Sequence, residues 1–339
     1  MSSVRSELLQ KWEEAAASQP GGTEWRAIAL SVRQPLRVLA AIREPDERPA
    51  LLLEAPLSDA PHRRLRWHSD GITLMDQRRP NETTIRLAIT LERNALREVF
   101  EVLAADLVEV AARAHQPSGA IAAVIRRLEA WQACLKAHRS GLSSEEQLGL
   151  LGELVVLRLI AEECGYAAAV SAWLGPLDGL HDFDRQGTAV EVKSAVGVGS
   201  LLPISALDQL DTTGLAALLV ARPRFREDPE GLSLSGMVLE VIAEIEDHAP
   251  AVLMSFKDRL LRAGIILSTE GPPDGLKVKL EELYGYSISP DFPRLTRSNV
   301  ETAITEASYL IDERALEAFL IDERALRRAA KAMAEDSNG

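Results

Sequence analysis

The chain has 339 residues, of which 46% are hydrophobic and 26% are charged, and its formal net charge is −13. These values predict a globular protein of two or three domains. The acidic balance argues against a protein that binds nucleic acid over its whole surface, although a local basic patch is compatible with it. The two cysteines, Cys134 and Cys164, form no CxxC pair, so the sequence indicates neither a zinc site nor a disulfide framework.

The first 140 residues are predicted to form a β-rich domain that is closed by helices. A helix is expected over 4–17, and the breaker sequence "SQPGGT" follows it. Clusters of Pro, Asp and Gly separate the β-like runs of this domain, which span 25–32, 36–42, 50–55 and 83–91. Helical periodicity over 94–114, and a second helix that fits 120–139 after the breaker "QPSG", predict the two closing helices.

A second domain is predicted over 141–270. Ser143 followed by Glu146 matches a capping box, which indicates the start of a helix, and Gly165 is the expected end of that helix. The elements expected after it are strands at 188–193, 217–222 and 236–244 and helices over 204–214 and 247–264.

Residues 271–339 are interpreted as a C-terminal extension with a partly strand-like run at 277–289. The hexapeptide "IDERAL" occurs at 311–316 and again at 321–326, which we interpret as a chance duplication of helix-compatible residues. The N-terminus lacks an apolar signal core, and the longest apolar run is too short to cross a bilayer. We therefore expect a cytoplasmic protein without a membrane partner.

The stretch "LHDFDRQGTAVEVKS", residues 180–194, carries two acids and a lysine in a β-prone context. Its turn-like centre predicts a hairpin that brings Asp182 beside Glu191. Because side chains alternate along a strand, Glu191 and Lys193 would project together while Val190 and Val192 pack on the other face. Two neighbouring carboxylates repel each other unless a cation lies between them, and such a site suits Mg²⁺. The alternative is an ordinary solvated strand face.

The helix expected from Ser143 carries an acid within its apolar stripe. Glu153 falls between Leu157 and Ile160 on a helical projection. A carboxylate on a core-facing stripe is costly unless it is paired or binds a metal, and nearby Gly149 and Gly152 would let the helix approach another backbone closely. The alternative is a glutamate at the edge of the stripe that reaches water.

The order of these motifs resembles the PD-(D/E)xK nuclease superfamily. The segments "GLLGELVVLRLI", "WLGPLDGLHDF", "AVEVKS" and "FPRLTRSNV" are similar to bacterial PD-(D/E)xK motif proteins that are grouped with restriction-modification and phage-defence genes. The resemblance is strong over 140–320 and weak over the N-terminal third. It implies an α/β protein whose restriction-endonuclease-like core, a mixed central sheet flanked by helices, lies between a β-rich N-terminal domain and a C-terminal extension.

The resemblance also implies roles for individual residues. Asp182 and Glu191 would be metal ligands, with the Val192 carbonyl as a further ligand, and Lys193 would be the catalytic lysine. Glu153 would complete the metal shell, and Gln209 resembles the glutamine that follows the ExK motif in several branches of the superfamily.

Two further features leave alternatives open. His181, which stands where many members have Pro, could be a ligand or phosphate contact, or a hydrogen-bonded structural residue. Arg222, Arg224 and Arg226 form the best local basic run and could contact a phosphate backbone, or lie in a solvated loop.

The expected function is Mg²⁺- or Mn²⁺-dependent endonucleolytic hydrolysis of DNA in a restriction-modification or phage-defence system. The rival interpretation is a non-catalytic DNA-recognition or scaffold subunit of a defence complex with a relic site. The expected partners are DNA, other subunits of a defence operon and a second copy of the chain.

Overall fold

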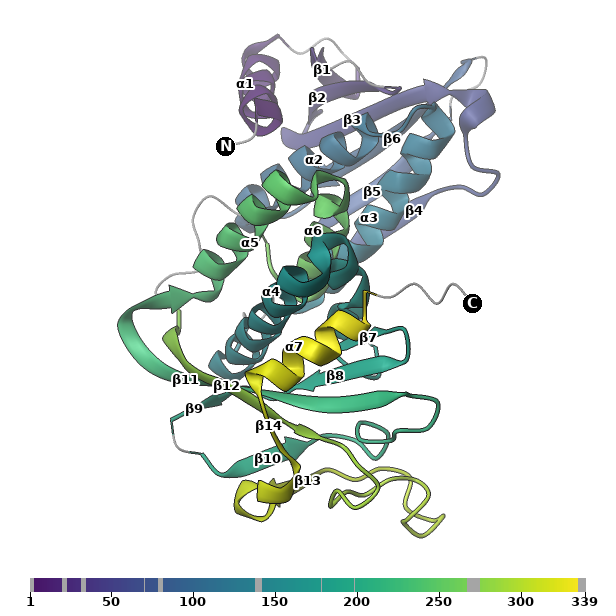
Figure 1. Cartoon of the computed structure of the whole chain (residues 1–339). Coiled ribbons are helices and arrows are strands. Elements are labelled where there is room, and N and C mark those ends of the chain that lie inside the picture. The colour runs from purple at the N-terminus through teal and green to yellow at the C-terminus, as the bar shows by residue number, and fades with distance from the viewer. Residues whose placement is uncertain are drawn as a thin grey trace. The chain divides into compact units, whose positions relative to one another are not determined.

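The computed structural model describes residues 3–19, 23–31, 35–69, 71–78, 82–137, 142–177, 179–197, 199–266 and 275–334. It divides into two compact units (Figure 1). The first unit contains Met1–Gly141 and Leu261–Gly271, and the second contains Leu142–Leu260 and Pro272–Gly339.

The first unit is an antiparallel sheet with helices against one face. The sheet has the order β1-β2-β3-β6-β5-β4, with β1 at Trp25–Ala29, β2 at Arg37–Arg43, β3 at Arg48–Pro56, β4 at Arg66–Ser69, β5 at Ile72–Gln77 and β6 at Thr84–Leu91. The helices are α1 (Ser3–Ala17), α2 (Arg97–Ala112) and α3 (Pro117–Ala137). Alternate strand residues such as Leu51 and Leu53 pack with helix residues such as Phe100 in one buried core.

Every strand and helix predicted for this unit is present, within a few residues at each end. The strands β4 and β5 were missed, because "RWHS" and "ITLMDQ" mix charged and apolar residues too briefly for a clear alternation.

The second unit contains a mixed sheet in the order β14-β12-β11-β8-β7. Its strands are β7 (Phe183–Arg185), β8 (Thr188–Val192), β11 (Ala217–Ser233), β12 (Lys277–Ser287) and β14 (Leu320–Asp322), and β9 (Ala195–Val196) pairs with part of β11. The strand β11 runs parallel to β8 and antiparallel to β12. This is the mixed sheet that a restriction-endonuclease-like core requires.

Helices cover one face of this sheet and a β-ribbon covers the other. Val190 and Ala221 pack against α4 (Ser144–Ala172) and α7 (Glu323–Ala332). Ala189 and Val220 pack with residues of β10 (Leu201–Ile204) and β13 (Tyr309–Asp312), which form an antiparallel ribbon. Two further helices, α5 (Leu234–His248) and α6 (Leu253–Arg262), follow β11 and precede β12 in the sequence. The side chain of Glu191 therefore belongs to the ribbon face, because parallel partners such as Glu191 and Val220 share a face.

Two local predictions for this unit were wrong, and a third was confirmed in part. The strand expected at 236–244 is part of α5, whose buried residues Leu234, Met237, Val238, Val241 and Ile245 follow a helical period. The helix expected over 204–214 is the end of β10 followed by turns, and one of them is fixed by a bond from the Thr213 amide to Asp211. The first helical segment of α4 does end at Gly165, whose φ of 81° and ψ of 158° are not helical, and a second segment continues from this kink to Ala172.

The segment expected as a C-terminal extension completes the sheet of the second unit through β12 and β14. The two "IDERAL" copies adopt the same local plan, in which an aspartate at the end of a strand caps a helical turn. Asp312 accepts the amide of Arg314, and Asp322 accepts that of Ala325 at the start of α7. Within the described ranges, no helix is long and apolar enough to span a bilayer.

Candidate active site

A tight hairpin places the first two acids side by side. Gln186 and Gly187 both have positive φ, 55° and 74°, which is the backbone of a type I′ turn. The turn sets the register in which Phe183 lies opposite Val190, and one more step places Asp182 opposite Glu191. Asp182 Oδ2 accepts the Val192 amide at 2.7 Å, so a side chain continues the ladder where β7 begins.

Glu191 is buried and has two cationic or polar partners. Its Oε1 lies 2.8 Å from Lys193 Nζ and accepts a hydrogen bond from Gln209 Nε2 at 2.7 Å. The side chain is 3% exposed, so the solvated-face alternative is wrong. Gln209 lies in a turn rather than on the expected helix, and its own Oε1 accepts the Ser205 amide at 2.8 Å. This second bond orients the amide so that its NH₂ group faces Glu191.

Glu153 reaches the same place from α4. Its Oε2 accepts the indole N–H of Trp173 at 2.6 Å. A Cβ atom added to Gly175 would lie 2.8 Å from Glu153 Oε2 and 3.0 Å from Asp182 Oδ1. Both carboxylates therefore border one point, which is open because residue 175 has no side chain. Trp173 and Gly175 were missed as site residues, although "WLGPLDGL" had marked their segment.

A second glycine brings the helix to the strand. A Cβ on Gly152 would lie 1.9 Å from Ser194 Oγ and 3.3 Å from Pro223 Cγ. The close approach expected of Gly152 is thus present, whereas Gly149 has nothing within 4 Å of its would-be Cβ. Because Glu153 follows Gly152 directly, this contact sets how near the Glu153 carboxylate comes to β8.

The electrostatics of the acids reflect their crowding. Burial, followed by the charge of Asp182, raises the pKa of Glu153 to about 8 and that of Glu191 to about 7, from an ordinary value of 4.5. Burial also raises the pKa of Asp182, against the opposing effects of the Val192 amide and the Lys193 charge. Each of the three carboxylates holds a proton more tightly than it would in water. A cation bound between them would offset the repulsion between their negative charges.

The donor set fits a hard divalent ion such as Mg²⁺. Across the described ranges, no three His, Cys, Asp or Glu side chains already form a metal cage. Mg²⁺ commonly uses only one or two carboxylates and keeps several waters, and Glu153 and Asp182 supply two around one point. The amide and carbonyl of one strand residue point to the same side, so the Val192 carbonyl lies on the side from which its amide reaches Asp182.

His181 lies beside these acids without joining them. The residue is buried at 3% exposure, and neither ring nitrogen has a hydrogen-bond partner by distance and angle within the described residues. Burial lowers the pKa of its imidazole. Within the described residues, no hydrogen bond joins the ring to Glu153, Asp182 or Glu191, whereas the backbone of Gln209 interacts with the imidazole and raises its pKa against the effect of burial.

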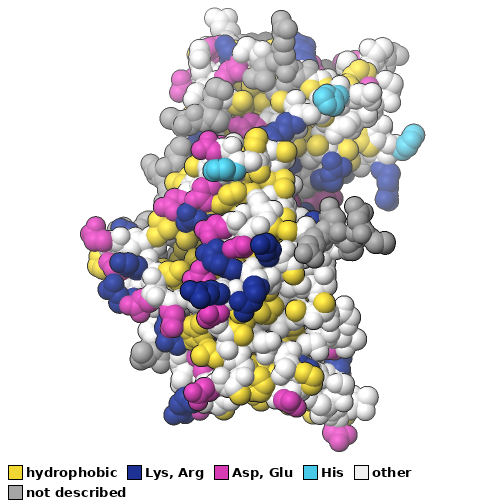
Figure 2. All heavy atoms as spheres, in the orientation of Figure 1, with side chains coloured by type: hydrophobic (Ala, Val, Ile, Leu, Met, Phe, Trp, Pro, Cys, Tyr) yellow, Lys and Arg dark blue, Asp and Glu magenta, His cyan; other side chains and the backbone are white. Residues whose placement is uncertain are grey.

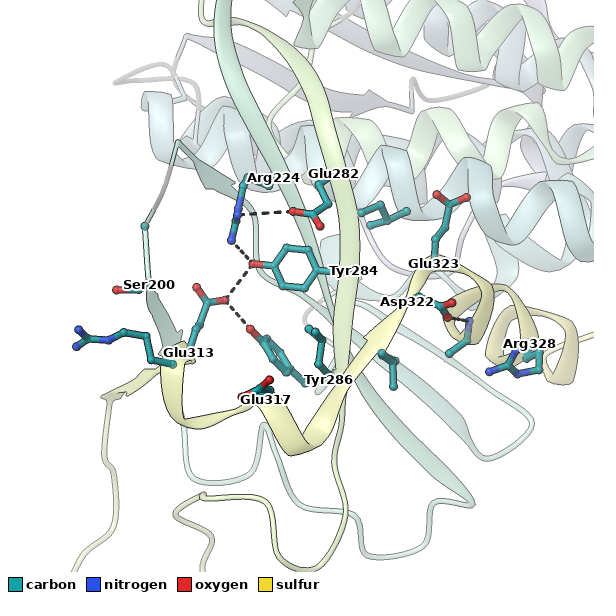
Figure 3. Close-up of a pocket in the computed structure, with 16 residues that line it drawn as sticks. Ser200, Arg224, Glu282, Tyr284, Tyr286, Glu313, Glu317, Asp322, Glu323 and Arg328 are labelled. Atoms are coloured by element: carbon teal, nitrogen blue, oxygen red, sulfur yellow. Dashed lines mark hydrogen bonds and ion pairs between the residues drawn. The ribbon is translucent and has the colours of Figure 1, made fainter.

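The basic run lies within β11, not in a solvated loop. Arg222 is buried and pairs with Glu313 at 2.7 Å, and it also donates to the carbonyl oxygen of Lys193 at 2.7 Å. Arg224 donates to the Tyr284 hydroxyl at 2.6 Å (Figure 3), and Arg226 pairs with acids at the surface. Both interpretations of the run were therefore wrong for Arg222, whose guanidinium supports the backbone of Lys193 and Ser194.

The family model described as "Putative PD-(D/E)XK family member, (DUF4420)" matches residues 8–313. No curated protein and no solved structure matches the chain. The matched range contains all four of the convergent residues Glu153, Asp182, Glu191 and Lys193. It also covers most of both units. The chain therefore belongs to this PD-(D/E)XK family.

Proposed function

We propose that this protein is a Mg²⁺-dependent DNA endonuclease. The observation that carries the proposal is the convergence of Glu153, Asp182 and Glu191 around one end of β8, with the Lys193 ammonium 2.8 Å from Glu191. Perturbed acids with a specific charge partner are typical of catalytic sites. Their order along the chain also matches the superfamily pattern.

The metal would be held by the carboxylates of Glu153, Asp182 and Glu191 and by the Val192 carbonyl. Bound there, a divalent ion neutralises phosphate charge and makes water a better nucleophile. Before it binds, Glu153 and Glu191 hold protons more readily near neutral pH than they would in water, because burial and the charge of Asp182 raise their pKa values to about 8 and about 7. The site thus exchanges protons for a cation, which makes metal affinity rise with pH.

Lys193 and Gln209 act from the Glu191 side. The ammonium of Lys193 can stabilise charge that develops on the phosphate, or help to take a proton from water. Gln209 holds Glu191 Oε1 through its NH₂ group and thereby limits the rotamers of that carboxylate. Arg222 anchors the carbonyl of Lys193 from behind. These contacts preorganise the site, as electrostatic catalysis requires.

The test is cleavage of plasmid and linear DNA, methylated and unmethylated, in Mg²⁺, in Mn²⁺ and in chelator. We expect products only with metal and none from Glu191→Gln. Glu246→Gln, which changes an exposed acid of α5, is the matched control and should cut like wild type. Wild type that cuts no DNA with either metal, or Glu191→Gln that cuts as fast as wild type, would contradict the proposal.

A non-catalytic DNA-recognition or scaffold subunit is the second candidate. The net charge of −13 and the absence, in the described part of the chain, of a ready-made three-ligand metal cage favour it. The cleavage assay and the Glu191→Gln variant distinguish the two candidates. A scaffold subunit would give no metal-dependent cleavage products, and its Glu191→Gln variant would still bind its partner and DNA.

A further inference from the structure

The last helix carries unpaired positive charge in a chain that is acidic overall. Arg324, Arg328 and Lys331 of α7 are exposed, and none of the three side chains has an ion pair or hydrogen bond within the described residues. Most other arginines of the second unit are paired, including Arg222, Arg226 and Arg297. Figure 2 shows Lys and Arg side chains gathered over the position of α7.

The three cations form a stripe that faces solvent. Their spacing of four and three residues keeps them within an arc of about 60° on a helix. The apolar residues Leu326 and Ala330 are buried on the far side, about 170° and about 130° from the centre of the stripe by the same geometry. The stripe is therefore directed outward by the packing of the helix itself, and it spans about 10 Å along the axis.

Nearby carboxylates do not neutralise this stripe. Among the acids near α7, Glu162 and Glu163 of α4 and Glu323 at the start of α7 all pair with the fourth cation, Arg327, and Asp322 caps the helix. Arg327 thus forms ion pairs with all three of these glutamates. The remaining three positive charges are left available to a partner.

The helix is attached to the strand that carries the candidate active site. Leu326 and Ala330 line one small cavity together with Val190 of β8, the residue before Glu191. At its other end, the carbonyl of Met333 accepts a hydrogen bond from Arg185 of β7. Contacts made by α7 therefore connect directly to the β7–β8 hairpin that positions Asp182 and Glu191.

We propose that Arg324, Arg328 and Lys331 form a docking surface for the phosphate backbone of duplex DNA, an inference that rests on the proposed function. A stripe of about 10 Å is long enough to reach about three successive phosphates of one strand, which span about 7 Å of axial rise at about 3.4 Å per step. Contacts of this kind set orientation without reading sequence. They also supply local attraction that a chain with a charge of −13 otherwise lacks.

Two other surfaces are less suited to phosphate. The groove beside β12 and β14, with a volume of about 1030 Å³, is lined by five acids, including Glu282 and Glu317, and by three arginines, one of which is Arg328 at its edge (Figure 3). The edge strand β4 and its approach carry only two exposed arginines without a side-chain partner in the described ranges, Arg63 and Arg66. Arg324, Arg328 and Lys331 carry three permanent charges, and none of them forms an ion pair within the described residues, although Arg328 also lines the edge of this groove.

The test measures the salt dependence of binding to a 30-base-pair duplex in chelator, where no cleavage occurs. The variant Arg324→Gln/Arg328→Gln/Lys331→Gln keeps good helix formers on α7. We expect its plot of log K against log salt to be shallower than that of wild type by about 2.7, at about 0.9 per lost phosphate contact. Arg63→Gln/Arg66→Gln is the matched control and should keep the wild-type slope.

An unchanged slope in the triple variant, or a slope reduced only by the Arg63/Arg66 variant, overturns the inference while leaving the proposed function intact. Wild type that does not bind duplex even at low salt overturns it too, and the cleavage assay then decides separately whether the proposed function stands. Arg328→Gln alone, with an expected change of about 0.9, provides the readout if the triple variant does not fold.

Discussion

Gly152 of α4 lies so close to Ser194 that a Cβ on the glycine would be 1.9 Å from the serine hydroxyl. The contact lets a helix carrying one acid meet the end of a strand carrying another. It predicts that Gly152→Ala is less stable than Gly149→Ala by about 1–3 kcal/mol, the usual cost of overpacking. Gly149 has open space and should gain about 0.5–1 kcal/mol from the better helix propensity of alanine. Urea unfolding of both variants checks this, and equal stabilities would mean that the contact relaxes without cost.

Metal should stabilise the folded protein through the acids. An ion that binds only the folded state raises the melting temperature by mass action. Asp182→Asn removes one of the like charges that border Gly175, so its melting temperature in chelator should exceed that of wild type, while most of the response to metal disappears. The measurement is thermal melting of both proteins in chelator and in about 10 mM Mg²⁺, which exceeds typically weak carboxylate binding. Four coincident curves would argue against a metal site.

The raised pKa values predict a pH dependence of stability without metal. Glu153 and Glu191 have folded-state pKa values of about 8 and about 7, above an ordinary 4.5, so the folded state binds more protons than the unfolded state in between. The stabilising contribution is complete below about pH 4.5 and is lost as pH rises through 7 to 8. Urea unfolding at pH 5.5 and 8.5 in chelator should therefore show a loss on the order of a few kcal/mol.

Glu153→Gln should flatten this pH dependence, because its amide cannot titrate yet can still accept the Trp173 indole N–H. Glu246→Gln, on the exposed side of α5, should retain the wild-type slope. If Glu153→Gln loses as much stability as wild type between the two pH values, the Glu153 carboxyl is not the group that titrates.

Lys193→Ala should reduce the rate far more than the affinity. Its ammonium contacts Glu191 at 2.8 Å and would act mainly on the transition state. We expect a loss of about 10²–10⁴ in the single-turnover rate, the usual range for a proton-transfer group, and DNA affinity within about threefold of wild type. A variant that cuts at the wild-type rate would leave Lys193 without a catalytic role.

The Arg222–Glu313 pair should be a structural support of the same segment. Both side chains are almost fully buried, and Arg222 also donates to the carbonyls of Lys193, Ser194 and Leu201. Glu313→Gln leaves a buried charge without its partner and should destabilise the protein by about 3–5 kcal/mol. Asp312→Asn breaks the neighbouring exposed pair with Arg314 and should cost less than about 1 kcal/mol. Chemical unfolding of the two variants distinguishes a buried from a surface pair.

Local sequence was sufficient for the hairpin and for the start of α4. The Gln-Gly turn, the alternation of Val190, Glu191 and Val192, and the Ser143–Glu146 capping box each depend on residues only a few positions apart. The physics of such elements is contained in short-range sterics and hydrogen bonds. The same reasoning failed for α5, whose β-branched residues suggested a strand until burial revealed a helical period.

Tertiary structure decided what these local elements do together. The sequence showed an acid on an apolar stripe, but only the missing side chains of Gly152 and Gly175 reveal how closely Glu153 approaches Asp182. Likewise, the arginine run looked free because its partner Glu313 lies 91 residues from Arg222. The outward direction of the α7 stripe also depends on tertiary structure. It follows from the packing of α7 on the central sheet, to which β12 and β14 belong. Burial and charge pairing depend on which distant segments meet, and a linear pattern does not carry that information.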